Sequence, residues 1–273
     1  MLLSKKEWLD ANQRADATEN RLLELSYTTL MNNVYGAEGY PWSPYRCISP
    51  ARALPNVSGC FPGVWNWDSA FHAVGVSRWD TALAREALLG FMQFQKENGL
   101  FPDVMFENGT LVDTFSKPPV LGWACEIVYK RDKNLEFLKK VYPMLVKNER
   151  YWTEHRAVDG LLHYDAEDTD SKDYELHVRY ESGWDNSVRW DKGIVSMWAI
   201  DLNCFMVMNY RALSYIAGEL SLTKDAQKWS DKAIALSALI NERLWDSQKH
   251  YYADADFKTH EISHVLSPAS FMP

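Results

Sequence analysis

Helical periodicity dominates the chain, and strand-like alternation of apolar and polar residues is hard to find. Near the start, Ser4 and Glu7 form a capping box, and apolar residues follow at helical spacing. This pattern predicts a first long helix over residues 5–33. Residues 34–66 are rich in glycine, proline and aromatic side chains, and they predict a loop.

Three further helices are predicted from the residues at their N-terminal ends. An apolar stripe starts at Asp80 and predicts a helix that ends near Asn98. The pair Pro118–Pro119 is typical of the opening of another helix. Asn134 caps the third, in which Pro143 predicts a kink or a boundary.

The second half of the chain begins with a long polar connection over residues 158–192, where little periodicity is found. Two more helices are predicted over 194–218 and 223–245. About seven helices thus follow one another in antiparallel succession, joined by alternately short and long connections. Stacked hairpins of this kind gather their long loops on one face, where a pocket can form. We therefore expect an all-α fold and one domain over 1–273, without an internal linker.

Composition limits the partners of the protein. The 273 residues are 47% hydrophobic and 24% charged, with a net charge of −8. The negative charge argues against nucleic acid and anionic membranes and leaves neutral small molecules as partners. No apolar run approaches the roughly 20 residues of a membrane span, and charges stand early in the chain, so we expect a cytoplasmic protein. The four cysteines are scattered, which fits reduced thiols.

Aromatic residues point to a class of ligand. Twelve Trp, fourteen Tyr and eleven Phe make up 14% of the chain, and many fall in glycine- and proline-bearing stretches. Flat apolar faces with a polar edge commonly line carbohydrate clefts, because sugar rings offer C–H faces to stack on and hydroxyl groups to bind. The alternative is that these side chains fill a large helical core.

The first stretch that could carry chemistry is 61–72, which contains Trp65, Trp67 and Asp68. Asp68 stands where a helix begins, so it could be a plain N-cap whose carboxylate accepts backbone N–H groups. In the functional interpretation, Asp68 accepts hydrogen bonds from sugar hydroxyl groups. Trp65 and Trp67 are then the walls on which the sugar stacks.

A second stretch, 113–120, is a polar loop that enters a helix through two prolines. Its Lys117 could donate a hydrogen bond to a ligand, or it could be an ordinary solvated lysine.

The third stretch, 181–191, lies in the longest connection and offers carboxylates, two indoles and Gly183, which lets the backbone approach a ligand closely. Glycoside cleavage requires a carboxylic acid that stays protonated near neutral pH, which desolvation against an aromatic wall provides. Asp185, next to Trp184, fits this need. The alternative is a capping aspartate paired with Arg189.

The fourth stretch matches a zinc motif. His260, Glu261 and His264 follow the pattern in which two histidines one helical turn apart hold zinc and a glutamate activates water. The pattern follows an acidic turn and leaves few residues for a third ligand. A zinc metalloprotease is therefore a remote alternative.

Three of these segments, 67–69, 116–119 and 181–190, together resemble the ordered motifs of a clan of inverting α-glycosidases. The clan contains glycoside hydrolase family 63, with its bacterial mannosylglycerate and glucosylglycerate hydrolases, and the related trehalases. The resemblance covers residues 40–273. It implies an (α/α) toroid of six helical hairpins, incomplete here because only about seven of twelve helices are predicted.

The resemblance also implies roles for individual residues. Asp185 corresponds to the general acid, and Trp67 and Asp68 correspond to residues that line the pocket for the cleaved sugar. Trp65, Lys117, Gly183, Trp184 and Arg189 complete the expected substrate-binding set. The expected substrate is a small α-linked glucoside or mannoside, and the implied chemistry requires no metal or organic cofactor.

The chain departs from the family pattern at two points. Lys117 replaces a glutamine that is common in trehalases. This difference argues against trehalose as the substrate, and a lysine could suit a substrate with an anionic group. The family's general base is a glutamate near the C-terminal end of the barrel, which we expect beyond residue 273. The chain alone is then expected to be inactive, a second chain could complete the ring as an oligomer, and the runner-up function is a non-catalytic sugar-binding fragment.

Overall fold

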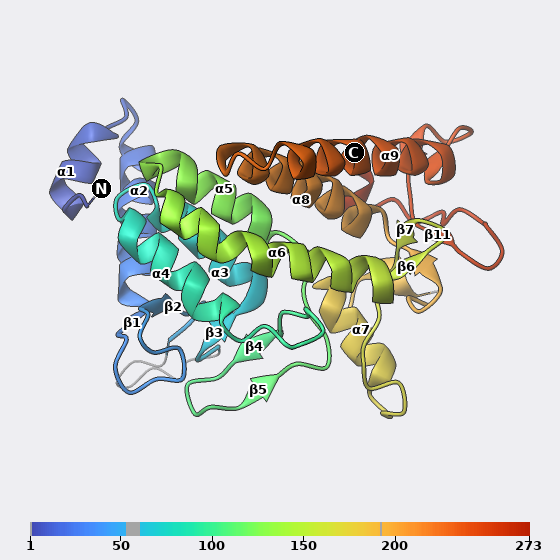
Figure 1. Ribbon diagram of the computed structural model, residues 1–273, viewed down its shortest axis with the longest axis horizontal. Coiled ribbons are helices and arrows are strands. Elements are labelled where there is room, and N and C mark those ends of the chain that lie inside the picture. Colours follow the sequence, from blue (N-terminus) through green and yellow to red (C-terminus); the bar gives the residue numbers. More distant parts are fainter. Residues whose placement is uncertain (1, 53–60, 192) are drawn as a thin grey trace. The chain divides into compact units, whose positions relative to one another are not determined.

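The computed structural model describes residues 2–52, 61–191 and 193–273 (Figure 1). Helices dominate, in agreement with the helical periodicity of the sequence, and two-residue strands lie in several of the connections. The chain divides into two compact units whose segments alternate along the sequence. Unit 1 consists of Met1–Phe94, Val104–Leu111 and Ala124–Val141, and unit 2 consists of Gln95–Asp103, Val112–Trp123 and Tyr142–Pro273.

Unit 1 holds the N-terminal helices and the first strands. Its elements are α1 (Lys5–Ala11), α2 (Ala17–Asn32), β1 (Val34–Tyr35), β2 (Cys47–Ile48), β3 (Val64–Trp65), α3 (Asn66–Val76), α4 (Thr81–Met92) and β4 (Val104–Met105). Three further elements contain residues of both units: β5 (Leu111–Val112), α5 (Leu121–Asp132) and α6 (Leu135–His155).

The long first helix expected over 5–33 is wrong, because the chain forms α1 and α2 instead. Asp16 is the N-cap of α2, and its Oδ1 accepts the backbone N–H groups of Thr18 at 2.7 Å and Glu19 at 2.9 Å. An N-cap residue has a non-helical backbone, so the first helix must end before it. The capping box of Ser4 and Glu7 is confirmed.

The core of unit 1 forms where α3 and α4 pack together and β2 packs on α4 (Figure 1). The apolar stripe that follows Asp80 is buried on α4 as predicted. Asp80 caps this helix through a 2.9 Å hydrogen bond to the N–H of Leu83. The helix ends at Met92, earlier than expected.

Pro143 does not break its helix, so the predicted boundary is wrong. Asn134 caps α6 as predicted, since its Oδ1 accepts the N–H of Phe137 at 2.9 Å. From there α6 runs without interruption through Pro143.

Unit 2 contains the long helical hairpin of α8 and α9 together with short strands and turns (Figure 1). Its elements are β6 (Ala157–Val158), β7 (Leu161–Leu162), α7 (Tyr174–Ser182), the 3-10 helix η1 (Val188–Trp190), β8 (Met197–Trp198), α8 (Ile200–Glu219), α9 (Thr223–Arg243), β9 (Trp245–Asp246), β10 (Tyr251–Tyr252), β11 (Ala255–Asp256) and the 3-10 helix η2 (Pro268–Phe271).

The observed secondary structure differs from the sequence prediction mainly in polar stretches of the chain. The connection predicted over 158–192 contains the helix α7, and α8 begins later than residue 194. The apolar stripe predicted for α9 is buried, with Trp229, Leu236 and Ile240 on the inner face. None of the helices in the described ranges is both long and apolar enough to cross a membrane.

Candidate active site

The first predicted stretch forms the passage from β3 into α3 in unit 1. Trp65 is the N-cap of α3, and its side chain makes no capping hydrogen bond. Asp68 lies in the first turn of the helix, so its interpretation as a plain N-cap is wrong. A carboxylate at this position lies at the positive end of the helix dipole, which stabilises its negative charge.

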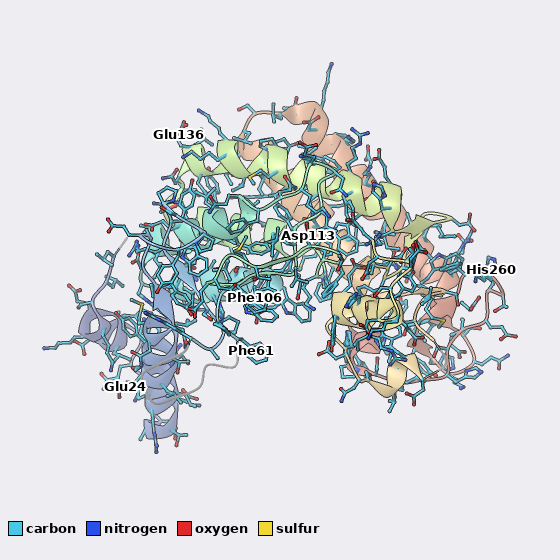
Figure 2. The ribbon with its side chains drawn as sticks, turned by 90° about the horizontal axis from the view of Figure 1, so that it is seen from below. Glu24, Phe61, Phe106, Asp113, Glu136 and His260 are labelled. Atoms are coloured by element: carbon cyan, nitrogen blue, oxygen red, sulfur yellow. The ribbon has the colours of Figure 1, made fainter. Side chains whose placement is uncertain are left out.

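Aromatic side chains surround Trp65. Its ring contacts the rings of Phe61 and Phe106 edge-on, with centroid distances of 5.3 and 5.7 Å. Figure 2 labels these two phenylalanines. Trp67 contacts Phe71 at 6.1 Å, and both Phe61 and Phe71 are about half exposed. Exposed rings beside a partly buried carboxylate are the features expected of a sugar-binding surface.

The second predicted stretch places Lys117 in the interior of unit 2. Its Nζ lies 3.3 Å from Asp103 Oδ1, donates to the backbone carbonyl of Tyr180, and stands 5.5 Å from the centre of the Phe115 ring. Only 9% of the residue is exposed, so the solvated-lysine interpretation is wrong. Since Asp103 compensates its charge, Lys117 offers little net attraction to an anion.

Glu181 is fully buried and joins several segments of unit 2. Its oxygens accept the backbone N–H groups of Ser116 at 3.2 Å and Asp165 at 2.8 Å. They also accept hydrogen bonds from Arg156, from Nε at 3.2 Å and from Nη2 at 3.3 Å. Burial lowers the pKa of the Arg156 guanidinium, but the charge of Glu181 more than offsets this, and the net pKa is raised. Glu181 therefore holds together the loops that carry the second and third predicted stretches.

The third stretch places Asp185 on an exposed turn. Gly183 ends α7 with φ of 69°, a left-handed conformation that glycine adopts without strain. Asp185 itself has φ of 30°, which is uncommon for a residue with a side chain. Its carboxylate is exposed, and among the described residues none forms a hydrogen bond or ion pair with it. The expected burial of this carboxylate against the neighbouring Trp184 is therefore not found in this structure. Uncommon backbone conformations of this kind cluster at functional sites.

Arg189 does not pair with Asp185, so that alternative is wrong. Its Nη2 lies 2.6 Å from Asp201 Oδ1 and 2.5 Å from Asp254 Oδ1, and its Nε donates to Asp254 Oδ2 at 2.6 Å. Asp201 Oδ2 also accepts the indole N–H of Trp184 at 2.7 Å. Burial alone would raise the pKa of Asp201, but the charge of Arg189 and these hydrogen bonds lower it below its usual value.

The zinc motif does not have the geometry that the metalloprotease alternative requires. The segment that contains His260, Glu261 and His264 is not helical, and His260 has φ of 62° (Figure 2 labels this residue). The two histidines are therefore not one helical turn apart. In the described parts of the chain, no group of His, Cys, Asp and Glu side chains could hold a metal ion.

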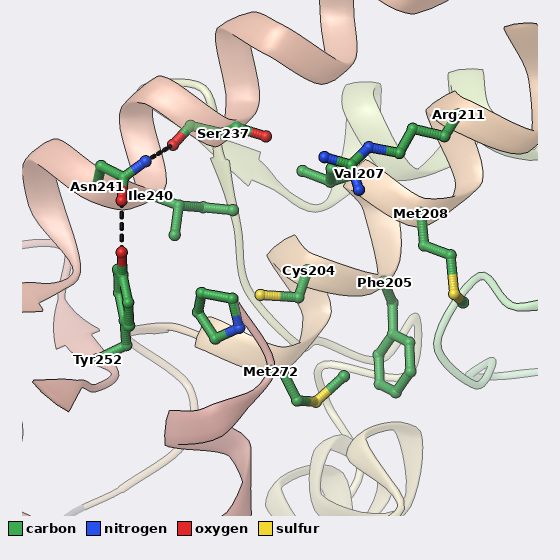
Figure 3. Close-up of a pocket in the computed structure, with 11 residues that line it drawn as sticks. Cys204, Phe205, Val207, Met208, Arg211, Ser237, Ile240, Asn241, Tyr252 and Met272 are labelled. Carbon is green, nitrogen blue, oxygen red and sulfur yellow. Dashed lines mark hydrogen bonds between the residues drawn. The ribbon is translucent and has the colours of Figure 1, made fainter.

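Several pockets lie in unit 2. One of about 800 Å³ has Trp245, Asp256 and Glu261 in its wall, a size and polarity that suit a small hydroxyl-rich ligand. Another, of about 440 Å³, is mostly apolar and lies against α8 and α9 (Figure 3). The lining of the second pocket contains no carboxylate side chain, so it lacks groups for acid catalysis.

The predicted site residues fall into two groups. Trp65, Trp67 and Asp68 lie together in unit 1. The residues of unit 2 are Lys117, Gly183, Trp184, Asp185 and Arg189.

Sequence reasoning missed the structural roles of Asp201 and Asp254. Asp201 stands in the first turn of α8, where acidic residues are common, so its sequence position did not distinguish it. Asp254 belongs to the acidic turn that precedes the zinc motif, and its position in the sequence does not relate it to Arg189.

Comparison with solved structures shows that other helix-rich proteins share the fold of this chain. The chain is similar to a family 63 mannosylglycerate hydrolase from Thermus thermophilus, with a TM-score of 0.70, 20% identity, and coverage of 91% of this chain and 71% of the other. It is also similar to the neutral trehalase Nth1 of Saccharomyces cerevisiae, with a TM-score of 0.64, 15% identity, and coverage of 83% and 54%.

The family follows from a sequence model that matches residues 61–273: the chain belongs to the mannosylglycerate hydrolase MGH1-like glycoside hydrolase family. Among curated relatives, the periplasmic trehalase of Citrobacter koseri is 24% identical, over 79% of this chain and 45% of its own length. A periplasmic trehalase of Escherichia coli O1:K1 has the same identity, with 46% of its length covered. The chain thus spans about half the length of the trehalases it matches.

Proposed function

We propose that this protein hydrolyses a small α-linked glucoside or mannoside by an inverting mechanism, with Asp185 as the general acid. The observation that carries the proposal is the exposed carboxylate of Asp185, which no described residue engages and which follows an anchored tryptophan in the segment that resembles the family's acid motif. The proposal includes a toroid of six helical hairpins, to which the hairpin of α8 and α9 belongs.

In this mechanism, Asp185 hands a proton to the glycosidic oxygen as positive charge develops on the sugar ring. A general base activates water on the opposite face of the ring, with the two carboxyl groups roughly 6.5 to 9.5 Å apart. Trp65 and Trp67 stack on the ring of the cleaved sugar, and Asp68 binds its hydroxyl groups. Most of the rate gain comes from this positioning and from fixed charges.

The residues of this chain define the second sugar or aglycone less narrowly than they define the sugar that is cleaved. Lys117 suggested an anionic substrate, but its charge is compensated by Asp103. Two of the similar proteins are named for mannosylglycerate and for trehalose. Both compounds, together with glucosylglycerate, form the substrate panel that tests the proposal.

The experiment measures the release of sugar from each compound of this panel. The enzyme used is the protein in the form in which the cell produces it. Asp185→Asn is expected to lower turnover by about 10²- to 10⁴-fold, the usual contribution of a general acid, while substrate binding stays measurable by calorimetry. The matched control is Asp191→Asn, which makes the same chemical change at another exposed position of the same loop and is expected to keep its activity.

Two results would contradict the proposal. Full turnover by the Asp185→Asn variant would show that Asp185 is not the general acid. Binding of α-glycosides without turnover by the unmodified protein would instead identify a non-catalytic sugar-binding protein, the second function that the sequence allowed.

A further inference from the structure

Beneath the turn that carries Asp185 lies a buried cluster of three charged residues, Arg189, Asp201 and Asp254. The side chains of Arg189 and Asp201 are entirely buried, and 4% of the Asp254 side chain is exposed. Three oxygens of the two carboxylates lie within 2.6 Å of the guanidinium nitrogens that face them. Hydrogen bonds between charged groups at such distances are strong and fix geometry.

The cluster is also bonded to the backbone at the start of α8. Asp254 Oδ1 accepts the N–H of Ile200 at 2.9 Å, and Asp201 Oδ1 accepts the N–H of Leu202 at 2.8 Å. These N–H groups belong to the first turn of the helix, where backbone donors have no partner within the helix itself. The cluster is therefore anchored to a regular element rather than to a loop.

Trp184 connects the cluster to the turn that carries Asp185, which we call the acid turn. Its indole Nε1 donates to Asp201 Oδ2 at 2.7 Å, and its ring faces the Arg189 guanidinium at 5.3 Å from the ring centre. Trp184 directly precedes Asp185 in the chain. Once the indole is fixed, the backbone that carries the Asp185 carboxyl group is fixed as well.

We infer that Arg189, Asp201 and Asp254 are positioning residues, which orient the acid turn through the indole N–H of Trp184. The inference rests on the proposed role of Asp185. It replaces the expected contact between Arg189 and the substrate, because the Arg189 guanidinium is buried and bound on two sides by carboxylates. A misplaced catalytic group lowers the rate of the chemical step and leaves ground-state binding largely unchanged.

The sharpest test is Trp184→Phe, which keeps an aromatic ring and removes only the N–H donor. We expect kcat to fall at least tenfold while KM changes by less than about threefold. The matched control is Trp190→Phe. The Trp190 ring also faces Arg189, at 4.3 Å, but its Nε1 has no hydrogen-bond partner within the described structure. This control is expected to keep its kcat even if the protein becomes less stable.

A second readout does not depend on activity. In the ¹H–¹⁵N spectrum, the indole N–H signal that disappears in Trp184→Phe is expected to shift in Asp201→Asn and in Arg189→Lys, and to stay in place in Asp185→Asn. An unshifted signal in both cluster variants would overturn the inference. A raised KM with unchanged kcat in Arg189→Lys would overturn it too, because it would indicate direct contact with the substrate.

The results also separate this inference from the proposed function. Loss of turnover in Asp185→Asn together with normal kcat in Trp184→Phe refutes the positioning role and leaves the acid role standing. Full turnover in Asp185→Asn refutes the acid role itself, and the positioning role with it.

Discussion

The indole Nε1 of Trp184 donates a 2.7 Å hydrogen bond to Asp201 Oδ2, and this bond joins the acid turn to the first turn of α8. The two residues are 17 positions apart in the sequence. Asp201 can be buried as a charged carboxylate because Arg189 compensates its charge in the interior. A buried carboxylate without such a partner would be strongly destabilising.

Glu181 is expected to be essential for stability. Glu181→Gln leaves the buried Arg156 guanidinium without its paired carboxylate, and breaking a buried ion pair costs about 3–5 kcal/mol. The free energy of unfolding, measured by urea denaturation, should fall by that amount. The control is Glu175→Gln, which removes the exposed pair with Arg179 on the same helix and should cost less than about 1 kcal/mol. Equal losses in the two variants would contradict this account of Glu181.

His72 is expected to make stability depend on pH. Burial lowers the pKa of His72 from 6.5 to about 4. Between these values the unfolded chain binds a proton that the folded chain does not, so stability falls as the pH drops from 6.5 to 4. The loss amounts to at most about 3 kcal/mol, at about 1.36 kcal/mol for each pH unit.

Unfolding curves at several pH values test this prediction. His72→Gln should give a flatter pH profile in the window from 6.5 to 4, because no titrating group remains at this position. The matched control is His155→Gln, which makes the same change at an exposed position. If the His72 variant lost stability just as steeply on acidification, the pH dependence would come from other groups.

Gly63 is expected to tolerate no side chain. Its φ is 115°, and a Cβ atom at this position would lie 2.4 Å from the carbonyl oxygen of Met105. Gly63→Ala should therefore lower the free energy of unfolding by about 1–3 kcal/mol. Gly36→Ala is the control, since a Cβ there would meet no atom within 4 Å. A Gly63 variant as stable as this control would show that the β3–β4 contact adapts freely.

The sequence predicted the apolar helices well. The stripes of α4 and α9 are buried as expected, and the capping residues Ser4 and Asn134 act as predicted. These signals are local, because a cap or a stripe is decided by residues within one or two helical turns. Local signals can be read without knowledge of the tertiary structure.

Polar segments were predicted less well. The helix α7 was missed because its buried residues include Glu181 and Ser182, which do not form an apolar stripe. Their burial depends on partners far away in the sequence, such as Arg156. The role of Arg189 was missed for the same reason, since its partner Asp254 lies 65 positions further along the chain. Long-range polar pairs of this kind leave no periodic signal.

The predicted roles of the site residues are not tested by their positions. Trp65 lies among aromatic rings at the start of α3, and Asp185 lies on a turn after α7. The cytoplasmic location and the substrate roles of the site residues stay predictions. Their chemistry depends on how a sugar fits the site, which residue spacing does not determine.

The most direct test of the acid role compares the turnover of two substrates by the Asp185→Asn variant. The two substrates differ only in their leaving group. A natural glycoside needs a proton on its departing oxygen, whereas 2,4-dinitrophenolate departs without one. The account predicts a loss of about 10²-fold or more on the natural α-glycoside and a loss below about tenfold on the 2,4-dinitrophenyl α-glycoside. Equal losses on both substrates, or no loss on the natural one, would contradict the assignment of Asp185 as the general acid.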